Sequence, residues 1–197
     1  MTQNFTIYEA SVDDEDVLGE IHVESWKAAY APFFAPEFFA EALQQRRTQW
    51  HDRIAKSEDT IMLAALERQP LVLSFFGSSP DRPGVAQIFS FFGHPAAWGT
   101  GIASALMTAT LRRLCQDGYN QVHLWTLRDT PQSRRFYAKN GFTESGAVRG
   151  YDFGDGNLVD QVEYELALTE LQGGSSNKQA ERKLRRETEA LAGDWRE

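Results

Sequence analysis

The 197-residue chain has few of the side chains that build disulfide frameworks and metal sites. It contains one cysteine, Cys115, and four scattered histidines with no metal-ligand spacing. A lone cysteine excludes an internal disulfide framework and a zinc site built on several thiolates. We therefore expect that the chemistry of this protein requires no metal ion.

Long apolar runs and an excess of basic residues are also missing. No run approaches the ~18 apolar residues of a membrane span, and the N-terminal MTQNFTIYEA lacks the basic and apolar regions of a signal peptide. The net charge of −8 argues against nucleic acid as the main partner and favours a cationic or neutral small molecule, although acidity can also serve solubility alone. We expect a cytoplasmic protein without membrane or nucleic-acid partners.

Composition indicates the domain organisation. Hydrophobic residues make up 42% and charged residues 24% of the chain, which excludes disordered, collagen-like and repeat classes for its body. The polar stretch 172–177 predicts a flexible linker between a domain over residues 1–171 and a charged, helical tail over 178–197. Leu191 and Trp195 belong to an apolar stripe of that tail, which leaves open a solvated helix, docking on the domain, or a homodimer.

Hydrophobic periodicity predicts a mixed α/β fold. Strands are expected over residues 5–8, 61–66, 71–76, 85–92 and 122–127, after Gly141-Phe142, and over 158–168. Helices are expected to begin at Ser11, to restart near Pro36 and continue toward residue 56, and to span 100–116 and 131–139. This order predicts a central, twisted, mostly antiparallel sheet of six to seven strands with one parallel βαβ crossover, flanked by about four helices.

A short glycine-containing loop, Gly99-Thr100-Gly101, lies between the strand 85–92 and the helix after it. Glycines there allow a sharp turn and bring successive N–H groups to the positive end of a helix, where a pyrophosphate binds well. A packing turn or a helix cap would look similar. Ser104 replaces the third glycine of a Rossmann loop, and Ile102 stands where a Walker lysine would follow.

A second informative segment spans residues 127–142. Tyr137 lies in a short helix directly after the crossover strand, which places its phenol near the carboxyl edge of the sheet, where open α/β folds usually bind ligands. Phe136 beside it is typical of simple packing.

Together the two segments resemble the GNAT superfamily of acyl-CoA-dependent N-acetyltransferases. Residues 98–103 match the cofactor motif of that family, with Trp98 departing from the usual first residue, and 130–142 match its second motif, with Thr130 in place of asparagine. The segment 22–30, HVESWKAAY, resembles the first helix of some members. The resemblance covers essentially the whole predicted domain.

The resemblance implies acetyl-CoA as the acyl donor. Backbone amides from Gly99 to Ala103 would hold its pyrophosphate, Trp98 would contribute mainly its amide, and Tyr137 would protonate the departing thiolate. The residues implied to contact acetyl-CoA are Phe92, Gly93, Trp98, Gly99, Thr100, Gly101, Ile102, Ala103, Ser104, Thr130, Ser133 and Phe136.

The acceptor side is less defined by the resemblance. The residues expected to contact the acceptor are Trp26, Tyr30, Gln87 and Trp125. Gln87 stands where similar proteins often carry a glutamate base, and an amide cannot accept that proton. His94 at the end of the same strand is a candidate base, although it is equally typical of a turn, and Glu24 and Glu163 are weaker candidates.

These observations predict an N-acetyltransferase that moves acetyl from acetyl-CoA to a primary amine of a small molecule or peptide. Because Gln87, Trp98 and Thr130 all depart from the family pattern, an acyl-CoA-binding sensor or partner-binding module with the same fold is the alternative. A nucleotide-dependent oxidoreductase of the Rossmann class is a third hypothesis, which the sequence from Phe136 to Phe142 disfavours.

Overall fold

The computed structural model describes residues 5–56 and 58–168. The predicted linker and tail, and the homodimer stripe within the tail, lie outside the described residues. In the part that is described, no helix is long and apolar enough to cross a bilayer.

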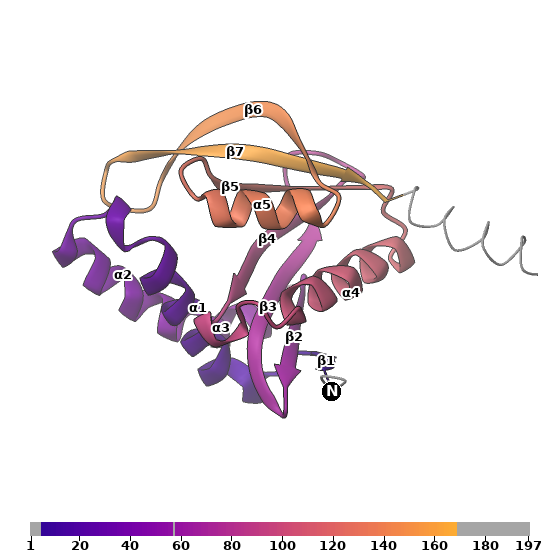
Figure 1. The fold of residues 1–197 in the computed structure, drawn as a ribbon, viewed down its shortest axis with the longest axis horizontal. Coiled ribbons are helices and arrows are strands. Elements are labelled where there is room, and N and C mark those ends of the chain that lie inside the picture. The colour runs from indigo at the N-terminus through magenta and orange to yellow at the C-terminus, as the bar shows by residue number, and fades with distance from the viewer. Residues whose placement is uncertain (1–4, 57, 169–197) are drawn as a thin grey trace, which may run out of the picture.

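Seven strands form one sheet in the order β1-β2-β3-β4-β5-β7-β6 (Figure 1). The strands are β1 (Phe5–Glu9), β2 (Thr60–Leu66), β3 (Gln69–Ser78), β4 (Ala86–Gly93), β5 (Gln121–Leu127), β6 (Thr143–Asp152) and β7 (Leu158–Ala167). Neighbours pair antiparallel except β4 and β5, which are parallel and joined through the crossover helix. The predicted fold class and the single parallel crossover are therefore confirmed.

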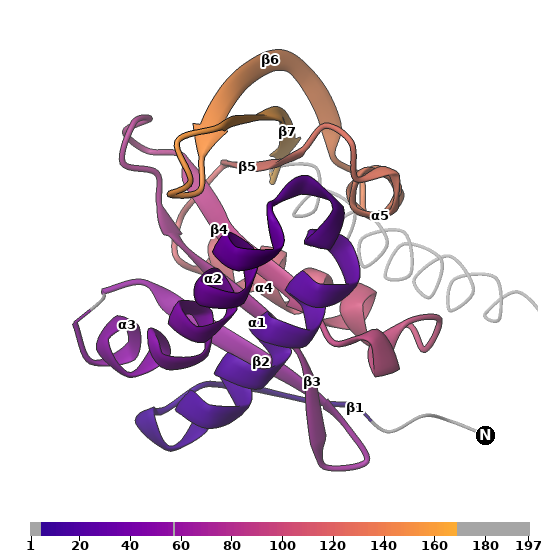
Figure 2. The ribbon, with the colours of Figure 1, turned by 90° about the vertical axis from the view of Figure 1, so that its left-hand side faces the viewer.

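Helices cover both faces of the sheet (Figure 2). On one face lie α1 (Glu15–Ala29), α2 (Pro36–Thr48) and α3 (Trp50–Lys56), and on the other α4 (Ile102–Gln116) and α5 (Pro131–Lys139). The segment 36–56, expected as one continuing helical region, divides into α2 and α3 around Gln49. Gly19 of α1 lies against the backbone of α2, because a Cβ there would be 2.3 Å from the carbonyl oxygen of Arg47.

The core has one layer on each side of the sheet. Leu18 and Ile21 of α1 and Trp50 of α3 pack on Leu63 and Leu73 of the central strands. On the opposite side, α4 and α5 bury apolar side chains against β3, β4, β5 and β7; those from the helices are Met107, Leu111, Leu114 and Tyr137. Because β2 and β3 are covered on both faces, their sequences are nearly continuous apolar runs.

The sheet splits between β4 and β5. Their parallel pairing extends only from Ala86 with Val122 to Ile88 with Leu124. The register between β3 and β4 also shifts at this point, since Phe75 pairs with Ser90 and its neighbour with Ile88, which leaves Phe89 as a bulged residue. Beyond Ile88 the two strands separate, and their facing backbone groups have no strand partner.

Candidate active site

A cavity of about 680 Å³ opens beside the split, between α1, the loop after β4, and α5. Its lining includes the ends of α1 and β4, the glycine loop with the first turn of α4, and α5 with the residues just before it. Among the residues it brings together are Ser25, Tyr30, Phe91, Phe92, Gly93, Trp98, Gly99, Gly101, Ala103, Ser104, Thr130, Ser133, Arg135, Phe136, Tyr137 and Lys139.

The glycine loop presents backbone donors to this cavity. Gly99 and Gly101 have φ values of 75° and 86°, which side chains other than glycine rarely adopt. Among the described residues, no acceptor pairs with the amides of Gly99, Gly101, Ala103 and Ser104. Unpaired N–H groups at the positive end of a 15-residue helix form a site for an anion.

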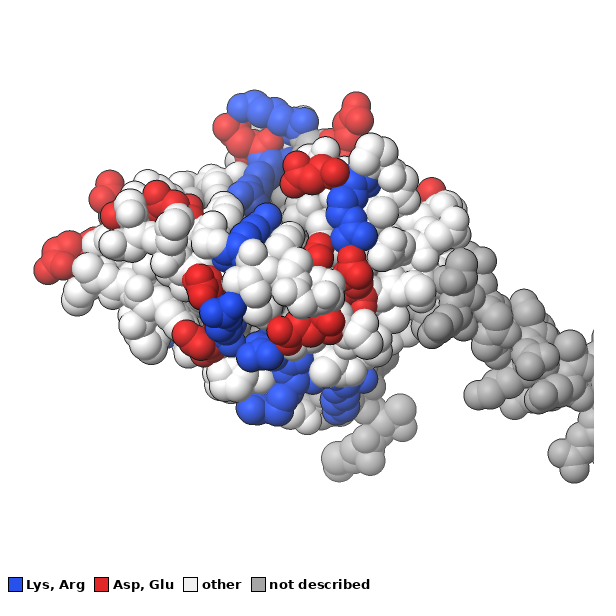
Figure 3. Space-filling view, turned by 90° about the horizontal axis from the view of Figure 1, so that it is seen from above, with Lys and Arg blue, Asp and Glu red and all other residues white. Residues whose placement is uncertain are grey.

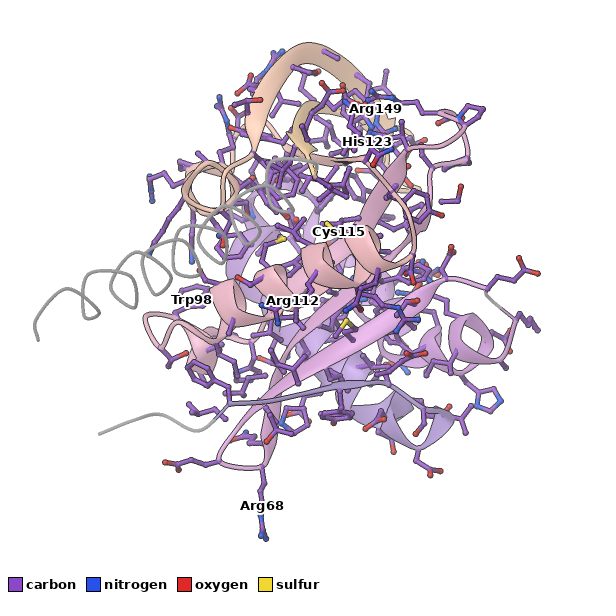
Figure 4. The ribbon with its side chains drawn as sticks, turned by 90° about the vertical axis from the view of Figure 1, so that its right-hand side faces the viewer. Arg68, Trp98, Arg112, Cys115, His123 and Arg149 are labelled. Atoms are coloured by element: carbon purple, nitrogen blue, oxygen red, sulfur yellow. The ribbon has the colours of Figure 1, made fainter. Side chains whose placement is uncertain are left out.

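Two predicted contact residues of this loop support it instead of lining the cavity. The Thr100 hydroxyl donates to the carbonyl oxygen of Ala97 at 2.7 Å and accepts from the amide of Ile102 at 3.3 Å. Ile102 itself is fully buried. Trp98 lines the cavity with a half-exposed side chain, and its N–H donates to the carbonyl oxygen of Pro95 at 3.1 Å, within the turn before the loop (Figure 4).

Helix α5 supplies the other wall. Ser133, Phe136 and Tyr137 lie there as the resemblance implied, and the Phe136 ring packs on Phe91 of β4 at 5.2 Å. The Thr130 side chain, which stands in place of the family's asparagine, donates to the carbonyl oxygen of Leu127 at 2.7 Å.

Sequence reasoning missed two basic residues of this wall, Arg135 and Lys139, which both line the cavity. Their spacing of four residues places them on one side of the helix. The sequence did contain this signal, since two basic residues four positions apart flank Tyr137. A ligand with several phosphates needs cations near the phosphate that binds at the start of a helix.

Two phenols line the cavity. Burial raises the pKa of Tyr137 far above its usual value, and Tyr30 adds to that shift. Burial also raises the pKa of Tyr30, to about 12. In the described structure the Tyr137 hydroxyl has no hydrogen-bond partner, although the ring is held by contacts with Phe136, Phe142 and Tyr164. Both hydroxyls are therefore protonated donors across the physiological pH range.

The candidate bases lie away from the cavity. His94 does not line it; its Nδ1 accepts from the amide of Ala96 at 3.0 Å and caps a short 3-10 turn. Glu24 pairs with Lys27 on the surface of α1. Glu163 is buried, and its carboxylate is held by His123, Ser145 and Arg82.

Three predicted acceptor residues lie on the α1–α3 side of the sheet without lining the cavity. Trp26 is buried among aromatic rings of α1 and α2. Gln87 is beside His123 in the parallel register, and Trp125 follows on the same face of β5, since alternate residues of a strand share a face. Only Tyr30 of the four lines the cavity.

A hydrogen-bond chain crosses this face beneath Gln87. His123 Nε2 lies 2.8 Å from Ser79 Oγ, and its Nδ1 lies 2.8 Å from Glu163 Oε1. Burial lowers the pKa of His123, and the Glu163 carboxylate opposes that shift. No group of three side chains suited to a metal ion occurs in the described ranges.

Comparison with known proteins identifies the fold and motifs. The model of the Acetyltransferase (GNAT) family matches residues 21–142. The chain belongs to this GNAT family. Membership confirms the predicted family and the predicted acetyltransferase class, and the matched range contains the glycine loop and Tyr137. A comparison with curated proteins gave no match.

Solved structures share the GNAT fold with this chain. The PaiA N-acetyltransferase of Thermoplasma acidophilum, in complex with coenzyme A, aligns with a TM-score of 0.65 at 18% identity, over 83% of this chain and 99% of its own. YncA of Salmonella typhimurium, described with acetyl-CoA, gives 0.61 at 18% identity over 83% and 94%. The ribosomal-protein-S18-alanine N-acetyltransferase of Escherichia coli gives 0.58 at 16% over 84% and 94%.

Proposed function

We propose that this protein transfers an acetyl group from acetyl-CoA to a primary amine of a small molecule or peptide. One observation carries the proposal: the unpaired amides at the start of α4 and the Tyr137 phenol line the same cavity, beside a split in the sheet. PaiA and YncA, which share the fold, are described with coenzyme A and acetyl-CoA.

The residues of the cavity fit this donor. A pyrophosphate would accept from the amides between Gly99 and Ser104, and Arg135 and Lys139 would add charge for further phosphates. The facing edges of β4 and β5 beyond Ile88 hold unpaired backbone donors and acceptors, which suit an extended chain that contains amides. When bound, acetyl-CoA supplies an activated acetyl group as a thioester.

Tyr137 would act as the general acid. Its phenol remains protonated because burial raises its pKa, so it holds a proton for a departing thiolate. The C–S bond breaks as the C–N bond forms, and the leaving sulfur becomes a thiol. The nitrogen gives up one proton to solvent, and the tyrosinate that remains regains one from solvent, so the reaction is balanced. The ring contacts with Phe142 and Tyr164 fix the phenol, which removes the need to order it during the reaction.

The acceptor must arrive as, or become, a neutral amine, since an ammonium has no lone pair. Free amines have a pKa near ~10.4, so most acceptor molecules are protonated at neutral pH. Asp129 is the one carboxylate among the residues that line the cavity in the described ranges, and it is exposed to solvent. We therefore expect turnover to increase with pH.

Release of the free CoA thiol with a panel of primary amines tests the proposed function. Thiol release that depends on both acetyl-CoA and an amine, with acetylated amine found by mass spectrometry, would support it. Calorimetric binding of acetyl-CoA without amine-dependent release across the panel would instead support the acyl-CoA-binding module.

A further inference from the structure

Three arginines on the α1–α3 side of the sheet form no salt bridge with a carboxylate of the described residues, although the charges of Asp81 and Glu163 act on one of them, Arg149. They are Arg46 of α2, Arg53 of α3 and Arg149 of β6, and we call them the arginine cluster. Each is partly buried. Among the described residues, salt bridges join four other arginines to carboxylates, and none involves the cluster; the paired ones are Arg82, Arg113, Arg128 and Arg134.

The unpaired state is unexpected from composition. The chain carries 28 acidic residues against 20 basic ones, so carboxylates are available for pairing. Burying a guanidinium without a counter-charge is costly, and proteins usually pair it. Positions that remain unpaired in an acidic chain therefore need a separate explanation.

Aromatic stacking explains how the guanidinium groups are oriented. The Arg46 guanidinium carbon lies 3.3 Å from the centre of the Trp26 ring, and that of Arg53 lies 5.3 Å from the Trp50 ring. Arg149 lies over Trp125 at 4.2 Å. Stacking holds each plane but leaves the N–H groups at its edge available.

Most of these N–H donors have no acceptor within the described ranges. A guanidinium has five donors, yet Arg46 gives one bond, to the Ala42 carbonyl, and Arg149 gives one, to Gln161. Arg53 gives none. The indole N–H groups of Trp26 and Trp50 are buried and also lack an acceptor. This region contains many donors and few acceptors.

The cluster converges on Tyr151 of β6. Burial lowers the pKa of Arg46, to about 10, and lowers that of Arg53 and Arg149, and in each case the Tyr151 hydroxyl acts in the opposite direction. For Arg149, the carboxylates of Asp81 and Glu163 also oppose the shift. The Arg149 guanidinium is 5.4 Å from the Tyr151 ring. Tyr151, which is exposed, is therefore a shared neighbour of arginines from α2, α3 and β6. In Figure 3, which looks down on the hairpin, basic side chains cross the middle of the visible face, with acidic side chains interspersed among them.

One layer of rings separates the cluster from the cavity. Trp26, beneath Arg46, packs on Tyr30 at 4.9 Å, and Tyr30 lines the cavity. Phe92 also lines the cavity and stacks on His22 at 4.2 Å. Burial lowers the pKa of His22, and the charges of Arg46 and Arg53 lower it further. Tyr30 and Phe92 therefore connect the lining of the cavity to the residues that contact the cluster.

We propose that the arginine cluster binds an anionic group, a carboxylate or a phosphate, carried by the acceptor amine. The inference rests on the proposed function, because it assigns the cluster to the acceptor of that reaction. It names the acceptor class as amines with a negatively charged group, such as amino acids or phosphorylated amines. This differs from the cationic or neutral ligand that the net charge alone favoured.

Matched pairs of amines test the inference. The probes are amino acids against their amides, and phosphoethanolamine against ethanolamine, at fixed ionic strength. Binding is measured by calorimetry and by thermal shift on protein saturated with CoA, and transfer is measured separately as release of CoA thiol from acetyl-CoA. The first pair reports a carboxylate and the second a phosphate.

We expect the anionic member of at least one pair to bind about 10-fold or more tightly than its neutral partner. Arg53→Gln and Arg149→Gln should each remove most of that preference. Arg112→Gln is the matched control, because Arg112 is an exposed arginine on α4, away from Arg149 (Figure 4). Arg46 is the less suitable site for substitution, since its side chain covers Trp26.

Equal binding of charged and neutral partners, no measurable binding of any anionic probe at millimolar concentration, or an unchanged preference in folded Arg53 and Arg149 variants would overturn the inference. The proposed function can fail separately. Anion-selective binding without thiol release would sustain the inference as a binding site and contradict transfer. Efficient acetylation of neutral and anionic amines alike would sustain transfer and contradict the inference.

Discussion

Tyr30 at the end of α1 and Tyr137 in α5 line the same cavity, and each has a pKa raised by burial. They come from helices on opposite faces of the sheet and meet where β4 and β5 separate. Tyr30 also contributes to the raised pKa of Tyr137. The cavity therefore holds two neutral phenols. The Tyr30 ring packs on Trp26, and the Tyr137 ring packs on Phe142 and Tyr164.

Replacing the hydroxyl of Tyr137 separates acid catalysis from packing. We expect Tyr137→Phe to lower kcat by about 10²-fold, near the lower end of general acid catalysis, because a thiolate is a tolerable leaving group. CoA affinity should persist, since the ring contacts remain. Tyr30→Phe is the matched variant and should preserve kcat more fully. Full kcat in Tyr137→Phe, at a pH where chemistry limits the rate, would show that another group protonates sulfur.

The pH dependence of kcat/KM depends on this phenol and on the acceptor amine. Because the pKa of Tyr137 is raised, its acid form persists above pH 10, so it produces no falling limb below that value. The neutral fraction of the amine increases over the same range. We expect kcat/KM to increase from pH 6 to about pH 10. A decline between pH 8 and 10 in an enzyme that remains folded would contradict an acid with a raised pKa.

Two glycines with the same conformation allow a controlled test of the loop. Gly101 and Gly118 have φ values of 86° and 90°, and a Cβ at either position would meet nothing within 4 Å. Alanine should therefore destabilise both by a similar amount, about 1 kcal/mol, through backbone conformation alone. Only Gly101→Ala should also weaken CoA binding, by about 10-fold, because it shifts the amides that begin α4. Calorimetry on both variants checks this, and equal CoA affinities would count against the loop.

Two buried histidines make stability depend on pH. Burial lowers the pKa of His22 and of His123, so the unfolded chain binds protons more readily near its ordinary value of about 6.5. The two neutral histidines contribute fully to the free energy of unfolding above pH 6.5. This contribution is lost as the pH falls, by up to about 1.4 kcal/mol per pH unit for each histidine. His22→Gln should reduce the slope of unfolding free energy between pH 6.5 and 5. Denaturant titrations at several pH values measure it, with an unchanged slope as the contrary result.

Local patterns in the sequence predicted the fold and the family, and they indicated the residues proposed to hold the acyl donor. Period changes located the strands and helices, and the glycine loop with Tyr137 marked two walls of one cavity. Both signals depend on short-range geometry, which sequence spacing records. The division of α2 from α3 at Gln49 was missed, since no proline or glycine marks it.

The acceptor side could not be predicted in the same way. Arg149 is far in sequence from Arg46 and Arg53, and only tertiary packing gives the three a shared neighbour in Tyr151. Trp26, which was expected to contact the acceptor, lies beneath the Arg46 guanidinium. The Trp98 amide is used within its own turn because the preceding Pro95 carbonyl is in reach, a contact that motif matching does not register.

The short pairing of β4 with β5 has a mechanical consequence. Strands β1–β4 and β5–β7 form two plates that meet edge to edge through three residue pairs, Ala86–Val122 to Ile88–Leu124, and Figure 1 shows them running in different directions. A ligand bound between β4 and β5 would contact both parts of the sheet and restrict their relative motion. Amide exchange over residues 89–93 and 125–127 should then slow when CoA is bound, while the β2–β3 hairpin keeps its own rate. In each turnover, the motion of β1–β4 relative to β5–β7 would decrease when the ligand binds and increase again when the product leaves.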